Sequence, residues 1–244
     1  MPYITAGDPP TPSLSELIVG MAEAGADIIE VGIPFSDPIA DGPVIASAMY
    51  RALEAGMTPA MVFTQVKQAR SSTDVALVGM VSDSIVAHLD RAQFVAQAAE
   101  AGFDGLIVPD ADTEDLGDLQ AACTTHGLTL TLLVAPTSTA ERQRAIVEHC
   151  SGFLYLLARA GVTGERAEAP DIAARVAELR ALSDLPIGVG FGISTADHVA
   201  AVGTSADGAI VGSALVRCLH EAHETGEDVG AAARSFVEGL HACT

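Results

Sequence analysis

Short apolar runs alternate with longer amphipathic stretches along the whole chain. The short runs are rich in β-branched residues and end at polar or turn residues, which is typical of buried strands. Between them, apolar residues recur three and four positions apart, most clearly at residues 89–101 and 171–182, which predicts helices with one buried face. The eight predicted strands lie at residues 3–5, 27–33, 75–81, 105–108, 128–134, 152–157, 186–190 and 208–211. A last helix is predicted at residues 227–242.

This alternation of strand and helix is typical of a parallel sheet built from repeated βα units. Eight evenly spaced units in one chain of 244 residues favour closure into a barrel over an open doubly wound sheet. An open sheet of that kind often begins with a GxGxxG turn, which does not open the first helix here. We therefore expect one α/β domain, a (β/α)8 TIM barrel over residues 1–244.

Capping residues support the predicted boundaries. Serine or threonine precedes four helical patterns, and two of these have the Ser-x-x-Glu spacing of a capping box, at residues 13–16 and 138–141. Glycines that close helices in the left-handed conformation are expected just before three strands. The N-caps expected are Ser13, Thr113, Ser138 and Ser194, and the closing glycines are Gly25, Gly102 and Gly127.

The composition excludes several classes of function. A formal net charge of −20 argues against a nucleic-acid-binding protein, which needs a basic surface. The apolar runs are much shorter than a membrane span, and residues 1–5 lack the features of a targeting signal. The four cysteines have no CxxC spacing, so neither a metal site nor a disulfide framework is indicated. We expect a cytoplasmic protein without a metal.

Two carboxylates near the end of the second strand are candidates for catalysis. Glu30 interrupts an apolar strand, so its side chain must face the barrel mouth or pair with a basic residue on a neighbouring strand. A carboxylate in a partly dry pocket can exchange protons near neutral pH. Asp41 lies in the following loop, where an aspartate taken alone is more often a turn residue or a helix cap.

Three glycine-bearing segments late in the chain predict an anion site. They follow the sixth, seventh and eighth strands, at residues 161–164, 190–194 and 212–213. Backbone N–H groups at glycines can approach a phosphate closely, and the last segment opens a helix whose positive end would face the anion. Loops after the seventh and eighth strands bind phosphate in many barrels.

The sequence EVGIPFSDPIADGP at residues 30–43 closely resembles the signature of tryptophan synthase α subunits. Further matches are YITAGDP at residues 3–9, RAGVTG at 159–164, GFGIS at 190–194 and VGSA at 211–214. The resemblance therefore covers essentially the whole chain.

The resemblance implies retro-aldol cleavage of indole-3-glycerol phosphate to indole and glyceraldehyde 3-phosphate, without a cofactor, in tryptophan biosynthesis. Glu30 would be the acid and base, and Asp41 would accept a hydrogen bond from the indole N–H. The resemblance places Tyr3, Ile107, Leu133 and Tyr155 around the indole, and Thr163, Gly164, Gly192, Gly212 and Ser213 around the phosphate. It also implies a β subunit as partner, in an α2β2 assembly.

Two loops depart from the family pattern. Members often have Met-Tyr-x-Asn after the third strand, where this chain has MVSD at residues 80–83, so that Val81 replaces the aromatic residue and Asp83 the asparagine. After the fourth strand, Asp112 replaces a proline. Both loops meet the β subunit in the family, and added acidic groups would repel an acidic partner surface. Family members also have a helix before the first strand, whereas this sequence begins almost directly at that strand.

These departures leave alternatives to a conventional α subunit open. The coupling to a β subunit can be weakened, so that the chain acts as a stand-alone indole-releasing lyase. The barrel can also be a weakly active or inactive partner that binds and activates a β-type subunit, although it retains both Glu30 and Asp41. Another phosphate-binding barrel enzyme of the same pathway is a third alternative.

Overall fold

A computed structural model describes residues 1–38, 41–112, 114, 116–158 and 172–241. Its eight strands lie close to the eight predicted runs and differ from them only at their ends. They are β1 (Tyr3–Thr5), β2 (Ile28–Gly32), β3 (Ala76–Met80), β4 (Gly105–Ile107), β5 (Thr129–Val134), β6 (Leu154–Leu157), β7 (Ile187–Gly190) and β8 (Gly208–Ala209). Each strand pairs in parallel with the next, in the order β1 to β8.

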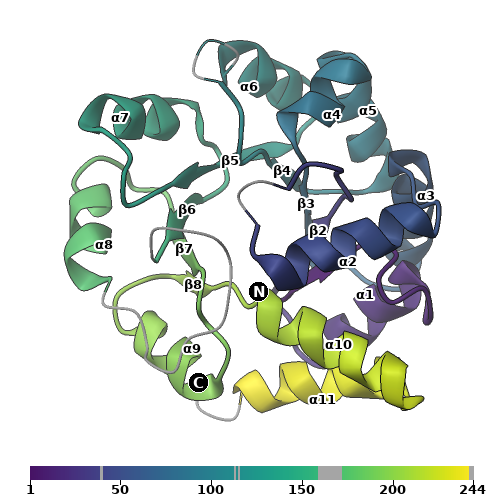
Figure 1. The fold of residues 1–244 in the computed structure, drawn as a ribbon. Helices are drawn as coiled ribbons and strands as arrows, with labels where there is room; N and C mark the ends of the chain where they lie inside the picture. Colours follow the sequence, from purple (N-terminus) through teal and green to yellow (C-terminus); the bar gives the residue numbers. More distant parts are fainter. Residues whose placement is uncertain (39–40, 113, 115, 159–171, 242–244) are drawn as a thin grey trace.

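The sheet closes on itself between β8 and β1. A parallel bridge joins Pro2 to Val211, and the backbone N–H of Tyr3 donates to the carbonyl of Val211 at 2.9 Å. Figure 1 shows the strands at the centre of a ring of helices. The expected (β/α)8 barrel is therefore confirmed.

The helices follow the strands in the order expected of βα units. No helix among the described residues is long and apolar enough to cross a membrane. The helices are α1 (Leu14–Glu23), α2 (Pro43–Glu54), α3 (Pro59–Arg70), α4 (Asp83–His88), α5 (Arg91–Ala101), α6 (Leu116–Thr125), α7 (Ala140–His149), α8 (Ala173–Arg180), α9 (Ala196–Gly203), α10 (Ser213–Thr225) and α11 (Val229–His241).

Alternate residues of each strand point to opposite sides of the barrel wall, because side chains alternate along a strand. Ile29 and Val31 of β2 pack outward in the large core between strands and helices. A smaller cluster containing Val78, Ile107, Tyr155 and Ile210 fills the barrel interior. Glu30, between the two outward residues of β2, consequently points inward.

Most of the expected helix ends are confirmed, and two N-caps are corrected. Ser13 forms the predicted capping box with Glu16, and the three closing glycines have φ values of +97°, +101° and +73°. The predicted caps Ser138 and Ser194 are wrong by one residue, since Thr139 and Thr195 cap α7 and α9. The Ser138 hydroxyl instead accepts from the N–H of Ala135 at 3.0 Å, which stabilises the preceding turn. The predicted cap Thr113 lies outside the described residues.

Candidate active site

Glu30 is fully buried inside the barrel, and neither carboxylate oxygen has a hydrogen-bond partner among the described residues. No basic side chain of a neighbouring strand pairs with it there, so the structure rules out the structural ion pair that the sequence left open. Burial, followed by the nearby charge of Asp41, raises the pKa of Glu30 from 4.5 to about 8. The side chain is therefore mostly protonated at neutral pH.

Asp41 follows a turn in which its N–H donates to the carbonyl of Pro38 at 3.1 Å. Gly42, not Asp41, is the N-cap of α2, and Pro43 occupies the first turn of that helix. The Asp41 side chain is thus not a helix cap, and it lines the same cavity as Glu30. Burial raises the pKa of Asp41 from 3.8 to about 6, so this carboxylate is mostly ionised at pH 7.

The α2 helix, which begins just after Asp41, is held to the loop after β1 by a partly buried ion pair. The guanidinium of Arg51 donates to both carboxylate oxygens of Asp8, at 2.8 and 2.7 Å. The side chain of Asp8 is 3% exposed, and that of Arg51 is 33% exposed. This two-point contact restricts how α2 can rotate, and it therefore helps to position the Asp41 loop.

The cavity at the carboxyl ends of the strands combines the two carboxylates with an apolar wall and a glycine rim. It is lined by Tyr3, Glu30, Asp41, Ile45, Met80, Pro109, Leu133, Tyr155, Phe191, Gly192, Ile193, Ile210, Gly212 and Ser213. Most of the residues expected at the site are therefore together in one place. A larger cavity of about 990 Å³ lies at the opposite end, among the beginnings of the strands, and contains none of them.

Two glycines make room for the tyrosines of the cavity, each in the strand next to the one that carries the tyrosine. A methyl group on Gly32 of β2 would overlap the hydroxyl of Tyr3, and one on Gly190 of β7 would overlap the hydroxyl of Tyr155. Both phenols are buried, and burial raises the pKa of each well above 10. Each tyrosine therefore presents a neutral hydroxyl near the carboxyl end of the next strand.

The rim of the cavity contains the glycines expected to bind an anion. Gly212 is the N-cap of α10, which begins at Ser213, so the positive end of this helix faces the cavity. Gly192 follows β7 and has a φ of +86°. The expected residues Thr163 and Gly164 lie outside the described residues.

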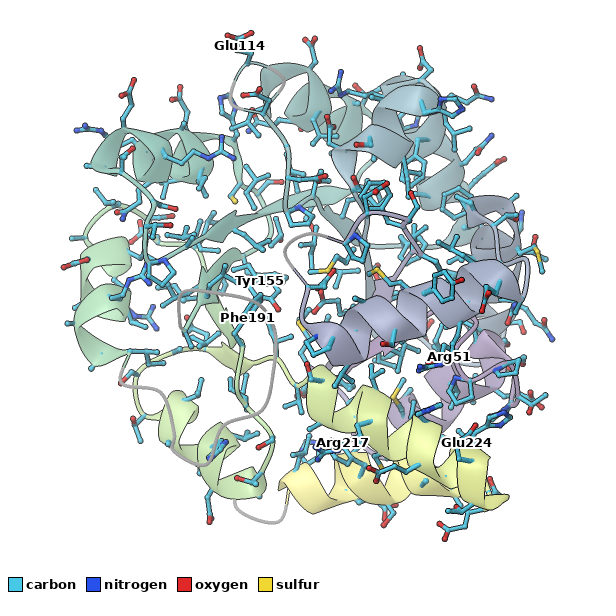
Figure 2. The ribbon with its side chains drawn as sticks, viewed as in Figure 1. Arg51, Glu114, Tyr155, Phe191, Arg217 and Glu224 are labelled. Atoms are coloured by element: carbon cyan, nitrogen blue, oxygen red, sulfur yellow. The ribbon has the colours of Figure 1, made fainter. Side chains whose placement is uncertain are left out.

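Phe191 was not identified from the sequence, although it lines the cavity and has a φ of +78°. A positive φ is strained for a bulky residue, and such strain persists only where the surrounding structure enforces it. Figure 2 shows Phe191 close to Tyr155 near the middle of the barrel. The glycine on either side of Phe191 was the only signal in the sequence that this turn is unusual.

Other residues that line the cavity were also not predicted from the sequence, and one predicted residue lies deeper in the barrel than the cavity. Ile107 is fully buried in the barrel interior, where it packs with Tyr155 and Ile210, and it does not line the cavity. Its neighbour Pro109, two residues further along, reaches the cavity. Met80 also lines it, whereas Val81 packs outward in the core, so the substitution at Val81 does not change the cavity wall.

The added acidic residue Asp83 is compensated within the chain. Its carboxylate accepts from Arg91 at 2.8 Å, and its backbone N–H donates to Asp110 at 2.8 Å. Ser82 also donates to Asp110, at 2.6 Å. These bonds join the loops after β3 and β4, and they weaken the argument that Asp83 would repel a partner.

The fold and the cavity together define a class of protein. A (β/α)8 barrel with two carboxylates of different pKa beside an apolar pocket, and a glycine rim at a helix N-terminus, has the layout typical of an enzyme that acts on a phosphorylated substrate. The sequence model of the tryptophan synthase alpha chain matches residues 1–244. The chain belongs to this family.

Individual relatives agree with this assignment. The chain is 45% identical to the tryptophan synthase alpha chain of Methanosarcina mazei over 241 residues, which are 98% of this chain and 87% of the relative. It is 43% identical over 233 residues to that of Haloferax volcanii, covering 93% and 83%. The crystal structure of tryptophan synthase subunit alpha from Legionella pneumophila superposes with a TM-score of 0.90 at 37% identity, covering 98% and 89%.

The family confirms the activity that the resemblance implied. The chain is an indole-3-glycerol-phosphate lyase of tryptophan biosynthesis. The alternatives of a weakly active or inactive partner barrel and of a stand-alone indole-releasing lyase are not favoured. The family match also argues against another barrel enzyme of the pathway.

Proposed function

We propose that Glu30 and Asp41 divide the cleavage of indole-3-glycerol phosphate between them. The observation that carries this proposal is the burial of Glu30 without a partner for either oxygen, beside a second carboxylate of lower pKa. Between about pH 6 and pH 8, Glu30 holds a proton while Asp41 is ionised. That combination supplies an acid and an anion in one cavity with a largely apolar wall.

The chemistry needs both groups. Glu30 donates its proton to C3 of the indole, and the ring then carries positive charge that is shared with the indole nitrogen. Asp41 accepts a hydrogen bond from the indole N–H and stabilises this charge. Glu30, now ionised, takes the proton of the hydroxyl on the carbon attached to C3. The C–C bond then breaks, its electrons neutralise the ring, and indole and glyceraldehyde 3-phosphate are released.

Substrate binding is assigned to the rest of the cavity. Tyr3, Leu133 and Tyr155 form apolar walls for the indole, and Ile107 supports them from the barrel interior. The backbone at Gly192 and Gly212, with the hydroxyl of Ser213, binds the phosphate at the positive end of α10. The same role for Thr163 and Gly164 rests on their family motif alone.

Two further proposals concern the domain organisation of the chain and its partner. We propose that residues 1–244 act as one domain and that the chain works with a tryptophan synthase β subunit. The ion pair between Asp83 and Arg91 supports this pairing, because it compensates one of the acidic departures. A cytoplasmic location fits a biosynthetic enzyme.

The test is release of indole from indole-3-glycerol phosphate by the purified chain. The protein has no tryptophan, so indole fluorescence can be followed directly. Glu30→Gln should abolish the reaction and Asp41→Asn should lower its rate about a hundredfold or more, while Glu54→Gln, at an exposed position on α2, should retain it. Full activity in either site variant would contradict the assigned role. Adding a β subunit then measures how strongly the two chains are coupled.

A further inference from the structure

The side chain of Tyr3 spans the cavity wall between two parts of the site. Near its base, a methyl group on Gly212 would lie 3.6 Å from the Cβ and Cδ1 atoms of Tyr3. At its tip, the hydroxyl is in contact with the backbone of Gly32 on β2. Glu30 is paired with Tyr3 across the two strands. Tyr3 therefore extends from the phosphate rim toward the strand that carries the acid.

The hydroxyl of Tyr3 is held in place by a second hydroxyl. Its oxygen lies 3.2 Å from Oγ1 of Thr5, and the two residues are 4% and 2% exposed. This is the one hydrogen bond of either side chain among the described residues. Each hydroxyl has one proton, and the bond between them uses only one, so the pair has a second proton to donate. A buried donor of this kind needs a partner when the site is dry.

The substrate supplies a matching group. The chain of indole-3-glycerol phosphate between its indole and its phosphate carries two hydroxyls. Glu30 acts on the hydroxyl next to the indole, which leaves the hydroxyl on the following carbon, toward the phosphate, without a partner. Tyr3 lies between the phosphate rim at Gly212 and the strand of Glu30, where this part of the substrate must pass.

We infer that the hydroxyl pair of Tyr3 and Thr5 binds the second hydroxyl of the substrate and so selects a glycerol chain over a deoxygenated one. This inference rests on the proposed function. Tyr155 has no comparable anchor, since its hydroxyl has no hydrogen bond among the described residues. Tyr3 is thus a specificity-determining residue and not only a wall of the indole pocket.

The test compares two substrates, indole-3-glycerol phosphate and the analogue that lacks the second hydroxyl. Both keep the hydroxyl on which Glu30 acts, so both can release indole. The wild-type protein should prefer the natural substrate in kcat/KM by about three- to tenfold, as expected for one neutral hydrogen bond. Tyr3→Phe should remove most of this preference, by lowering kcat/KM for the natural substrate several-fold more than kcat/KM for the analogue.

Three further variants distinguish a hydrogen bond from Tyr3 to the substrate from a purely structural role of its side chain. Thr5→Val removes the anchor and should reduce the preference partly. Tyr50→Phe removes the hydroxyl of a tyrosine that is 62% exposed on α2, and it should keep the full preference. Tyr155→Phe should also keep the preference, whatever its effect on the rate with both substrates.

The outcomes are distinct. Equal losses on both substrates in Tyr3→Phe would show that Tyr3 only packs, and loss of the preference in Tyr155→Phe alone would assign the contact to the other tyrosine. Equal cleavage of both substrates by the wild-type protein would overturn this inference and leave the proposed function intact. Absence of indole from either substrate would overturn the proposed function and the inference with it.

Discussion

Replacing Glu30 by Gln should stabilise the fold while it destroys the activity. A buried carboxyl with a raised pKa keeps its proton in the native state at a pH where the unfolded chain has lost it. The free energy of unfolding then falls as the pH rises from the unfolded to the native pKa. For Glu30 this range runs from 4.5 to about 8. Glutamine cannot ionise, so the variant should not show this loss.

The size of this effect on the free energy of unfolding follows from the pKa shift of Glu30. Each pKa unit corresponds to about 1.4 kcal/mol, so the full shift costs the wild-type protein about 5 kcal/mol above pH 8 and about 3 kcal/mol at pH 7. Near pH 4.5 the two proteins should have similar stability, because both side chains are then neutral.

Urea unfolding followed by far-UV circular dichroism, at intervals from pH 4.5 to pH 8.5, measures the effect. The difference between Glu30→Gln and the wild-type protein should grow steadily with pH. Glu54→Gln is the matched control, since its carboxylate is exposed and should leave the pH dependence unchanged. Parallel curves for Glu30→Gln and the wild-type protein would refute the reasoning, because Glu30 would then be ionised in the native state.

Three other changes have defined outcomes. Asp41→Asn should lower kcat about a hundredfold or more, and the acid limb of the pH profile near pH 6 should disappear with it, as measured by indole release. Arg51→Met should lower the free energy of unfolding in urea by about 2 to 3 kcal/mol, because Asp8 keeps a buried charge without its partner. Gly190→Ala should cost about 1 to 3 kcal/mol and raise KM for the substrate, because its methyl group displaces Tyr155.

Each of these changes has a control. An acid limb that stays near pH 6 in Asp41→Asn would show that another group titrates there. Adding Asp8→Asn to Arg51→Met should restore part of the stability. If the double variant instead lost the sum of the two single losses in free energy of unfolding, the two side chains would not be coupled and the ion pair would not explain the effect. Gly203→Ala on α9 faces open space and should cost nothing. An equal loss at both glycines would mean that the contact with Tyr155 is not the cause.

Local sequence pattern was enough to predict the barrel, and it limited Glu30 to two placements, the barrel mouth or an ion pair with a neighbouring strand. The spacing of apolar residues encodes whether a segment is strand or helix, and the alternation along β2 places Ile29 and Val31 outside and Glu30 inside. The glycines before strands were predicted for the same reason, because a helix end needs a left-handed residue within its own segment. These features depend on neighbours a few positions away.

Features that depend on contacts between strands needed the tertiary structure. The sequence does not show why Gly32 and Gly190 must lack a side chain, because the tyrosines that occupy the space come from the strand alongside. The sequence also does not show that Val81 packs outward in the core while its neighbour Met80 lines the cavity. Likewise, the one-residue error at the caps of α7 and α9 arose because adjacent serine and threonine have similar capping ability.

The sequence by itself determined the class of fold, the family and the two carboxylates, since these depend on periodicity and on a continuous motif at residues 30–43. Only the tertiary structure decided how the site is assembled. Closure of β8 onto β1 brings Tyr3 beside Gly212, more than 200 residues away in the chain. The register of β1 with β2 then sets Tyr3 beside Glu30. Register and closure are properties of the whole barrel, because they follow from how all eight strands pack, and no single segment encodes them.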